Sequence, residues 1–118
     1  MLHIVNKSPG ERATLASCLA HARPGHSVLL IEDAVYGFLD EGTPMAALAP
    51  DHCIVLDSLS KKVAPGLALG FIVSPPRLRE RIMAAVRSGG WTAAGFAFAA
   101  GQRLMADGTV AELSRLKR

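Results

Sequence analysis

The side chains best suited to chemistry follow two apolar stretches of this chain. Asp33 and Tyr36 come directly after the run SVLLIE, and Ser58, Ser60 and Lys61 lie at or just beyond the end of the run CIVLDS. The amine of a lysine can condense with an aldehyde, and a carboxylate can keep a ring nitrogen protonated. Open α/β sheets bind ligands at the carboxyl ends of their strands, so we expect Asp33 and Lys61 to meet at one such edge.

Four short apolar runs rich in β-branched residues predict the strands that would position these side chains. They are LHIV at 2–5, SVLLIE at 27–32, CIVLDS at 53–58 and GFIVS at 70–74. Between the first two runs, Ser8, Pro9 and Glu11 match the start of a capped helix. A strand, a helix and a strand joined by short turns predict a βαβ unit with a right-handed crossover.

The connection between the third and fourth runs decides the direction of the last strand. It is short, and Pro65 and Gly66 lie inside it, so a helical crossover is hard to fit. We therefore expect the fourth strand to be antiparallel at the edge of the sheet. Residues 1–118 as a whole are predicted to form a single three-layer α/β domain, with about four mostly parallel strands flanked by helices.

Helices are predicted for most of the last third of the chain. Ser74 is expected to cap a helix that opens with two prolines and buries the face that carries Ile82 and Val86. Thr109 with Glu112 matches a capping box for a short terminal helix. Residues 91–106 between them are apolar nearly all round, and a helix of that kind must be buried by something. It either covers the core or leaves an apolar patch that drives formation of a homo-oligomer.

Composition and charge exclude several classes of protein. Half of the residues are hydrophobic and 19% are charged, which argues against disorder. The net charge of +3 comes from arginines without interleaved aromatics, which indicates a solvated helix face and a soluble basic tail, not a nucleic-acid site. No apolar run reaches the roughly 18 residues of a membrane span and no signal peptide is visible, so we expect a cytoplasmic protein. Cys18 and Cys53 lack metal-ligand spacing, so we expect reduced thiols and no metal site.

Residues 1 to about 36 carry the first family resemblance. MLHIVNKSP, then SCL, then RPG and VLLIEDAVY resemble the TusB/DsrH family. The resemblance implies a small α/β subunit of the sulfur relay that thiolates the wobble uridine of tRNA or serves sulfur oxidation. It also implies work within a hetero-oligomer, where persulfide passes along the cysteines of the partners.

Cys18 is the thiol to which this resemblance draws attention. It is predicted on the buried face of the first helix, with Leu15 and Leu19 at helical spacing around it. A cysteine that transfers sulfur should be exposed and should have a stabilised thiolate. We therefore favour a packing role for Cys18 over a transfer role.

Residues from about 30 to 118 carry a second resemblance. IEDAVYGFLDEG, PMAALAPD and IVLDSLSKKVAPGLALGFIVSPPRL are similar to the core of fold-type I pyridoxal-phosphate aminotransferases, in particular the subgroup that includes aminotransferase-like transcription regulators. The resemblance implies that Lys61 is the Schiff-base position and Asp33 the partner of the pyridine nitrogen. It further implies that Tyr36 contacts the ring oxygen and that Ser58 and Ser60 contact the phosphate.

The second resemblance is incomplete at the phosphate. Ala68 stands where most members of that family carry an arginine, two residues before the Gly70–Phe71 pair. The phosphate loop, the ring-stacking aromatic and the arginine for the substrate carboxylate belong to parts of the family that this sequence lacks. Because a phosphate with few cationic partners binds poorly, we expect weak or no binding of pyridoxal phosphate and no transamination.

The two resemblances overlap at the hexapeptide IEDAVY, residues 31–36. Our main hypothesis is therefore a recombined scaffold, chimeric or designed, without native catalysis. It would join a sulfur-relay-like part, residues 1–36, to an aminotransferase-core-like part, residues 31–118. Two alternatives stay open: residual pyridoxal-phosphate binding through Lys61, and a sulfur-relay or tRNA-thiolation partner module that acts through Cys18.

Overall fold

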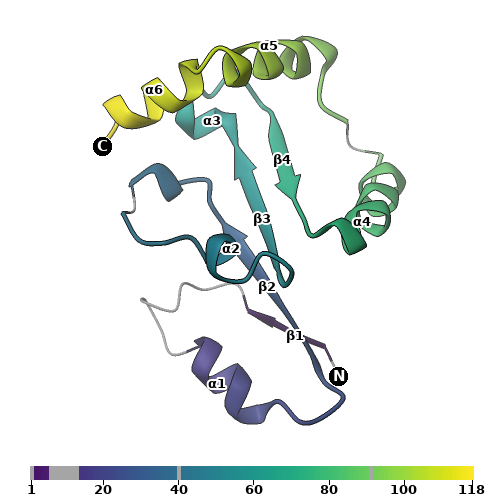
Figure 1. Ribbon diagram of the computed structural model, residues 1–118. Coiled ribbons are helices and arrows are strands. Elements are labelled where there is room, and N and C mark those ends of the chain that lie inside the picture. Colours follow the sequence, from purple (N-terminus) through teal and green to yellow (C-terminus); the bar gives the residue numbers. More distant parts are fainter. Residues whose placement is uncertain (1, 6–13, 40, 91) are drawn as a thin grey trace.

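A computed structural model describes residues 2–5, 14–39, 41–90 and 92–118, and it confirms the mixed α/β class (Figure 1). The expected helix cap at Ser8 to Glu11 lies outside these residues. The strands are β1 (Leu2–Val5), β2 (Ser27–Asp33), β3 (Cys53–Ser58) and β4 (Gly70–Val73). The helices are α1 (Thr14–His21), the 3-10 turn η1 (Gly37–Leu39), α2 (Met45–Leu48), α3 (Leu59–Lys62), α4 (Pro76–Ser88), α5 (Gly95–Ala106) and α6 (Thr109–Leu116).

The strands pair in the order β1-β2-β3-β4. β1 with β2 and β2 with β3 are parallel, and α1 joins the first two as a βαβ unit. β4 runs antiparallel to β3, because only the four residues of α3 and a turn around Pro65 and Gly66 connect them. A parallel fourth strand would need a connection that brings the chain back to the end of the sheet where β3 begins. This connection is too short for that. The predicted direction of the last strand is therefore the observed one.

One cluster of buried apolar residues lies under α1 and α2. Leu30, Met45 and Cys53 are its buried members, and Cys18 packs against them from α1. Leu30 and Cys53 are partners in the register of β2 and β3, so both point to the same face of the sheet. Side chains alternate between the two faces of β2 and β3, and α1 and α2 pack on the face that carries Leu30 and Cys53.

A second cluster lies beyond the end of β3, where α3, α5 and α6 meet (Figure 1). Leu59 is fully buried there, and α5 approaches it through Gly101. A Cβ atom at Gly101 would lie 3.1 Å from Leu59 Cδ1 and would collide with Leu69. Glycine is required at this position because α5 comes so close to the two leucines.

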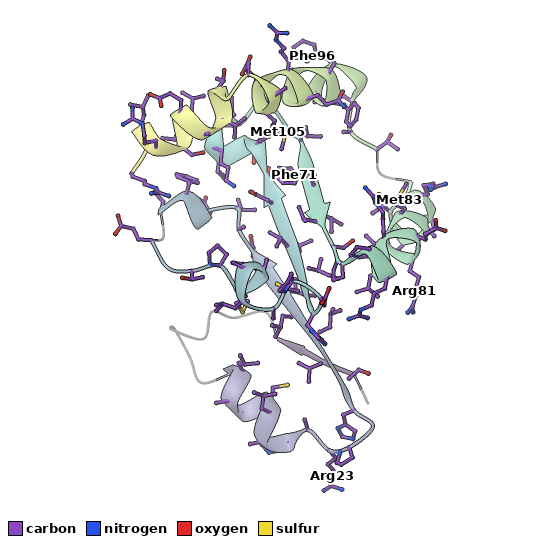
Figure 2. All side chains as sticks on the ribbon, in the orientation of Figure 1. Arg23, Phe71, Arg81, Met83, Phe96 and Met105 are labelled. Carbon is purple, nitrogen blue, oxygen red and sulfur yellow. The ribbon has the colours of Figure 1, made fainter. Side chains whose placement is uncertain are left out.

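The outer side of α5 is exposed and apolar. Phe96 is 83% exposed and projects away from the sheet, and Phe98 is 51% exposed (Figure 2). The helix therefore covers the second cluster with one side and leaves an apolar patch on the other. Formation of a homo-oligomer through this patch stays a prediction.

α4 departs from its predicted environment. None of its residues is buried, although Ile82 and Val86 were expected to face the core. The expected cap at Ser74 is also wrong, because Pro75 occupies the cap position with an extended backbone and no side chain bonds there. The helix lies beside the edge of the sheet (Figure 1), where β4 is its nearest strand.

The three-layer arrangement is not observed in the described part of the chain. The Cα atoms span 46 × 35 × 20 Å, whereas two helix layers about 10 Å on either side of a sheet would make the shortest extent about 25 Å. The helices α1 and α2 pack on the sheet, but α5 and α6 pack beyond its end and α4 beside its edge (Figure 1). None of the described helices has both the length and the apolar character that a membrane crossing demands.

The start of α6 differs from the predicted capping box. Gly108 occupies the cap position with φ 84°, and the carboxylate of Asp107 accepts hydrogen bonds from the Thr109 backbone N–H at 3.0 Å and its hydroxyl at 2.6 Å. Glu112 instead forms an ion pair with Arg115 at 2.7 Å. The carboxylate that holds the first turn comes from before the helix and not from inside it.

The basic tail is not fully solvated. The ammonium of Lys117 donates hydrogen bonds to the carbonyls of Lys61 and Lys62, each at 2.9 Å. The guanidinium of Arg118 donates to the carbonyl of Phe38 at 2.8 Å. These bonds tie the end of the chain to α3 and η1, although Lys117 and Arg118 both stay exposed to solvent.

Candidate functional site

The carboxyl ends of β2 and β3 form one edge of the sheet. Asp33 ends β2 and is the register partner of Leu56, and Ser58 ends β3 two residues later. The backbone N–H of Ala34 extends the pairing by donating to the carbonyl of Leu56 at 2.8 Å. Lys61 follows in α3. The structure therefore places the predicted carboxylate, serines and lysine at or just after the carboxyl ends of two adjacent parallel strands.

Asp33 and Tyr36 shape the turn that leaves β2. One carboxylate oxygen of Asp33 accepts a hydrogen bond from the backbone N–H of Val35 at 3.1 Å, which is the usual turn-forming contact of an aspartate. Tyr36 is 57% exposed, and its ring centroid lies 6.4 Å from that of Phe38. Both polar groups are open to solvent at this edge.

The two serines form hydrogen bonds with each other. The Ser58 hydroxyl accepts a hydrogen bond from the Ser60 backbone N–H at 3.1 Å and caps α3, and the two hydroxyl oxygens lie 2.8 Å apart. Asp57 accepts from the Ser58 backbone N–H at 2.6 Å. The hydroxyls act here as a helix cap, and a phosphate would have to displace these contacts.

The two neighbouring lysines of α3 have different surroundings. Lys62 forms an ion pair with Asp57, and both side chains are largely buried. The amine of Lys61 makes no hydrogen bond or ion pair with any residue that the structure describes, and the residue is exposed. Lys61 is therefore the lysine of this pair whose amine is accessible to an aldehyde.

The residues at this edge suit the ring of pyridoxal phosphate better than its phosphate. A carboxylate, a phenol and an accessible amine are available in Asp33, Tyr36 and Lys61. For the phosphate, Lys62 is already held by Asp57 and residue 68 is an alanine, so neither of these two positions offers a free cation. A phosphorylated cofactor would thus lack the charge-assisted hydrogen bonds that normally hold it.

The two thiols lie in the first cluster at different depths. Cys53 is 3% exposed, and burial raises the pKa of its thiol, with a further rise from the nearby charge of Glu32. Cys18 is only partly buried on α1. Cys18 therefore packs against the cluster, as expected, but it is the less deeply buried of the two thiols.

Glu32 was not among the residues singled out from the sequence. Its carboxylate accepts hydrogen bonds from the backbone N–H groups of Met45 at 3.3 Å and Ala46 at 3.0 Å, and one oxygen lies 3.9 Å from Cys53 Sγ. It thereby holds the start of α2 on β2. Strand alternation was the available signal, because Glu32 must point to the opposite face from Asp33.

Within the described ranges, no three His, Cys, Asp or Glu side chains gather closely enough to hold a metal ion.

Comparison with protein families gives one match. Residues 7–58, a little under half of the chain, are similar to the family described as DsrH like protein. The match runs from before α1 through β2 and α2 to the end of β3. It continues without a break past Tyr36, where we had expected the sulfur-relay resemblance to end. The predicted change of family at IEDAVY gains no support from this match.

Comparison with curated proteins gives a relative among transcription regulators. The chain is 36% identical over 63 residues to the uncharacterized HTH-type transcriptional regulator YdeF of Bacillus subtilis. The aligned part is 52% of this chain but 14% of the regulator, so this chain spans about a seventh of that relative's length.

Proposed function

We propose that this chain is a sulfur-relay-related module that takes up persulfide sulfur on Cys18. The observation that carries the proposal is the DsrH-like match over residues 7–58. This stretch contains the elements that surround Cys18, namely α1, β2, α2 and β3. An unbroken match across these elements favours a working module of this kind over an inactive recombined scaffold.

The chemistry assigned to Cys18 balances without an added oxidant. The thiolate of Cys18 attacks the outer sulfur of a donor persulfide, and a new sulfur–sulfur bond forms on Cys18. The sulfur–sulfur bond of the donor breaks, and its electron pair leaves on the inner sulfur as the donor thiolate. Cys53 is not the acceptor, because burial keeps its thiol protonated and out of reach.

Mass spectrometry after incubation with glutathione persulfide tests the proposal. The chain should gain one sulfur atom, and peptide mapping should place it on Cys18. Cys18→Ser should abolish the gain, whereas the matched variant Cys53→Ala should keep it. Sulfur found only on Cys53, or no gain at all in the folded protein, would reject the proposal.

The accessible amine of Lys61 favours a second candidate, covalent binding of pyridoxal phosphate at the carboxyl edge of β2 and β3. Lys61 lies beside the serine pair of α3, and Asp33 lies at the same edge. The relative's description as a transcriptional regulator supports this candidate, because the aminotransferase resemblance is to the subgroup that includes such regulators. The missing cation for the phosphate makes weak binding the expected outcome.

Absorbance spectroscopy tests the second candidate. Adding pyridoxal phosphate should produce a band near about 420 nm, where protonated internal Schiff bases absorb. Lys61→Ala should remove the band, and Lys62→Arg, which keeps a cation beside Asp57, should retain it. Reduction with borohydride followed by peptide mapping should place the label on Lys61. Absence of the band, or its survival in Lys61→Ala, rejects this candidate.

A further inference from the structure

β4 is the outermost strand at one side of the sheet, and its surface is apolar. It pairs with β3 alone in the described sheet, and its sequence GFIV contains neither proline nor a charged residue. Ile72 is 42% exposed and Val73 is 56% exposed. An edge strand of this composition is a template for pairing with another chain, because nothing in its sequence blocks such pairing.

The register shows which backbone groups of β4 face outward. The Leu59 N–H donates to the Leu69 carbonyl at 2.9 Å, one step beyond the last register pair of β3 and β4. Hydrogen-bonded pairs alternate with non-bonded ones in an antiparallel ladder, so Phe71 and Val73 bond inward to β3. The N–H and C=O groups of Gly70 and Ile72 therefore point away from β3, where no described residue pairs with them.

A groove of about 750 Å³ lies along this open edge, between β4 and α4. Phe71, Ile72 and Val73 line it from the strand, and Ile82, Met83 and Val86 line it from the helix. The groove has the size of an ordinary ligand-binding cleft, and it is mostly apolar. The apolar side of α4 lines this groove, and none of the residues of α4 is buried.

The charges at the groove are all positive. Arg79 and Arg87 are the charged residues that line it, while Arg81 lies on the side of α4 away from β4 (Figure 2). A second copy of this chain would bring its own two arginines against these, and the whole chain is already positive at +3. Charge complementarity therefore favours an acidic partner over self-association.

We propose that β4 binds an extended, acidic segment of another protein as an added strand. The outward groups of Gly70 and Ile72 would pair with its backbone, its apolar side chains would enter the groove, and its carboxylates would face Arg79 and Arg87. Strand addition of this kind takes its affinity from main-chain hydrogen bonds and its selectivity from the neighbouring side chains. The proposal goes beyond both functions above and depends on neither of them.

Fluorescence anisotropy of the full chain with a short labelled peptide of alternating valine and glutamate tests the proposal. The matched peptide carries lysine in place of glutamate. We expect the acidic peptide to bind, and the basic one to bind at least about tenfold more weakly because of Arg79 and Arg87. No binding of the acidic peptide, equal binding of both, or dimers of the chain held by β4 in light scattering would overturn the proposal.

Two sets of variants separate main-chain pairing from charge. Ile72→Pro removes an outward N–H and leaves the bonds to β3, since proline is tolerated at such edge positions, whereas Ile72→Thr keeps the N–H. The first should abolish peptide binding and the second should keep it. The double variant Arg79→Glu with Arg87→Glu should reverse the preference between the peptides. Should circular dichroism show that Ile72→Pro does not fold, the charge reversal decides, and an unchanged preference overturns the proposal.

Discussion

The ammonium of Lys62 forms an ion pair with the carboxylate of Asp57, and the two side chains are 15% and 10% exposed. The pair joins the end of β3 to α3, immediately beside Lys61. It fixes the direction in which α3 leaves the sheet. It also holds one of the two adjacent lysines in a structural role and leaves the other available.

Asp57→Asn should lower the free energy of unfolding by about 1–3 kcal/mol, because it leaves a largely buried ammonium without its charged partner. Asparagine keeps an acceptor for the Ser58 backbone N–H, so the change reports on the ion pair. Urea denaturation monitored by circular dichroism measures the difference. The matched control is Glu112→Gln, which breaks the exposed pair with Arg115 and should change stability little. Equal effects of the two variants would contradict this account.

Gly101→Ala should destabilise the protein by about 1–3 kcal/mol, since the added methyl group would collide with Leu69 and crowd Leu59. Gly95→Ala is the control in the same helix. Nothing lies within 4 Å of a Cβ at Gly95, so alanine should be neutral or stabilise by up to about 1 kcal/mol. Thermal unfolding of both variants checks the prediction, which fails if Gly101→Ala unfolds no more easily than the wild type.

The strands could be predicted from the sequence because their signals are local. The apolar runs at 27–32 and 53–58 correspond to β2 and β3 within one residue, and the short link after β3 gave the direction of β4. The packing of the helices could not be predicted in the same way. Whether α4 reaches the core depends on the whole chain, and no local pattern states that it lies at the sheet edge instead.

The candidate site, too, could be predicted from the sequence only in part. The position of Asp33 and Ser58 at one edge follows from two parallel strands, which the sequence indicates. The contact of Lys117 with the carbonyl of Lys61 joins residues far apart in the chain, and nothing in the basic tail distinguishes it from a solvated one. Such long-range contacts define the surroundings of Lys61, and only the structure reveals them.

The stability of the protein should fall with rising pH through the titration of Cys53. Burial raises the pKa of this thiol above the ordinary value of 9.0, so the folded state holds the proton more tightly than the unfolded state. The contribution is fully present below pH 9.0 and is lost as pH rises through the higher folded pKa. Urea denaturation of wild type and Cys53→Ala across this range should give a smaller loss for the variant. Parallel pH profiles would show that Cys53 does not titrate in this way.

Lys117→Met should loosen α3 without removing the accessible amine of Lys61. The Lys117 ammonium donates to carbonyls at the end of α3, and losing these bonds should lower the free energy of unfolding by about 1 kcal/mol. The loss should also speed hydrogen exchange at the Val63 N–H, which donates to the Leu59 carbonyl at 2.8 Å. Arg103→Met, on the exposed face of α5, is the control and should leave that exchange rate unchanged. Lys117 bonds to the backbone carbonyl of Lys61 and not to its amine. Any absorbance band from pyridoxal phosphate should therefore survive in Lys117→Met. Loss of the band there would mean that the order of α3, and not only the amine, is needed for binding.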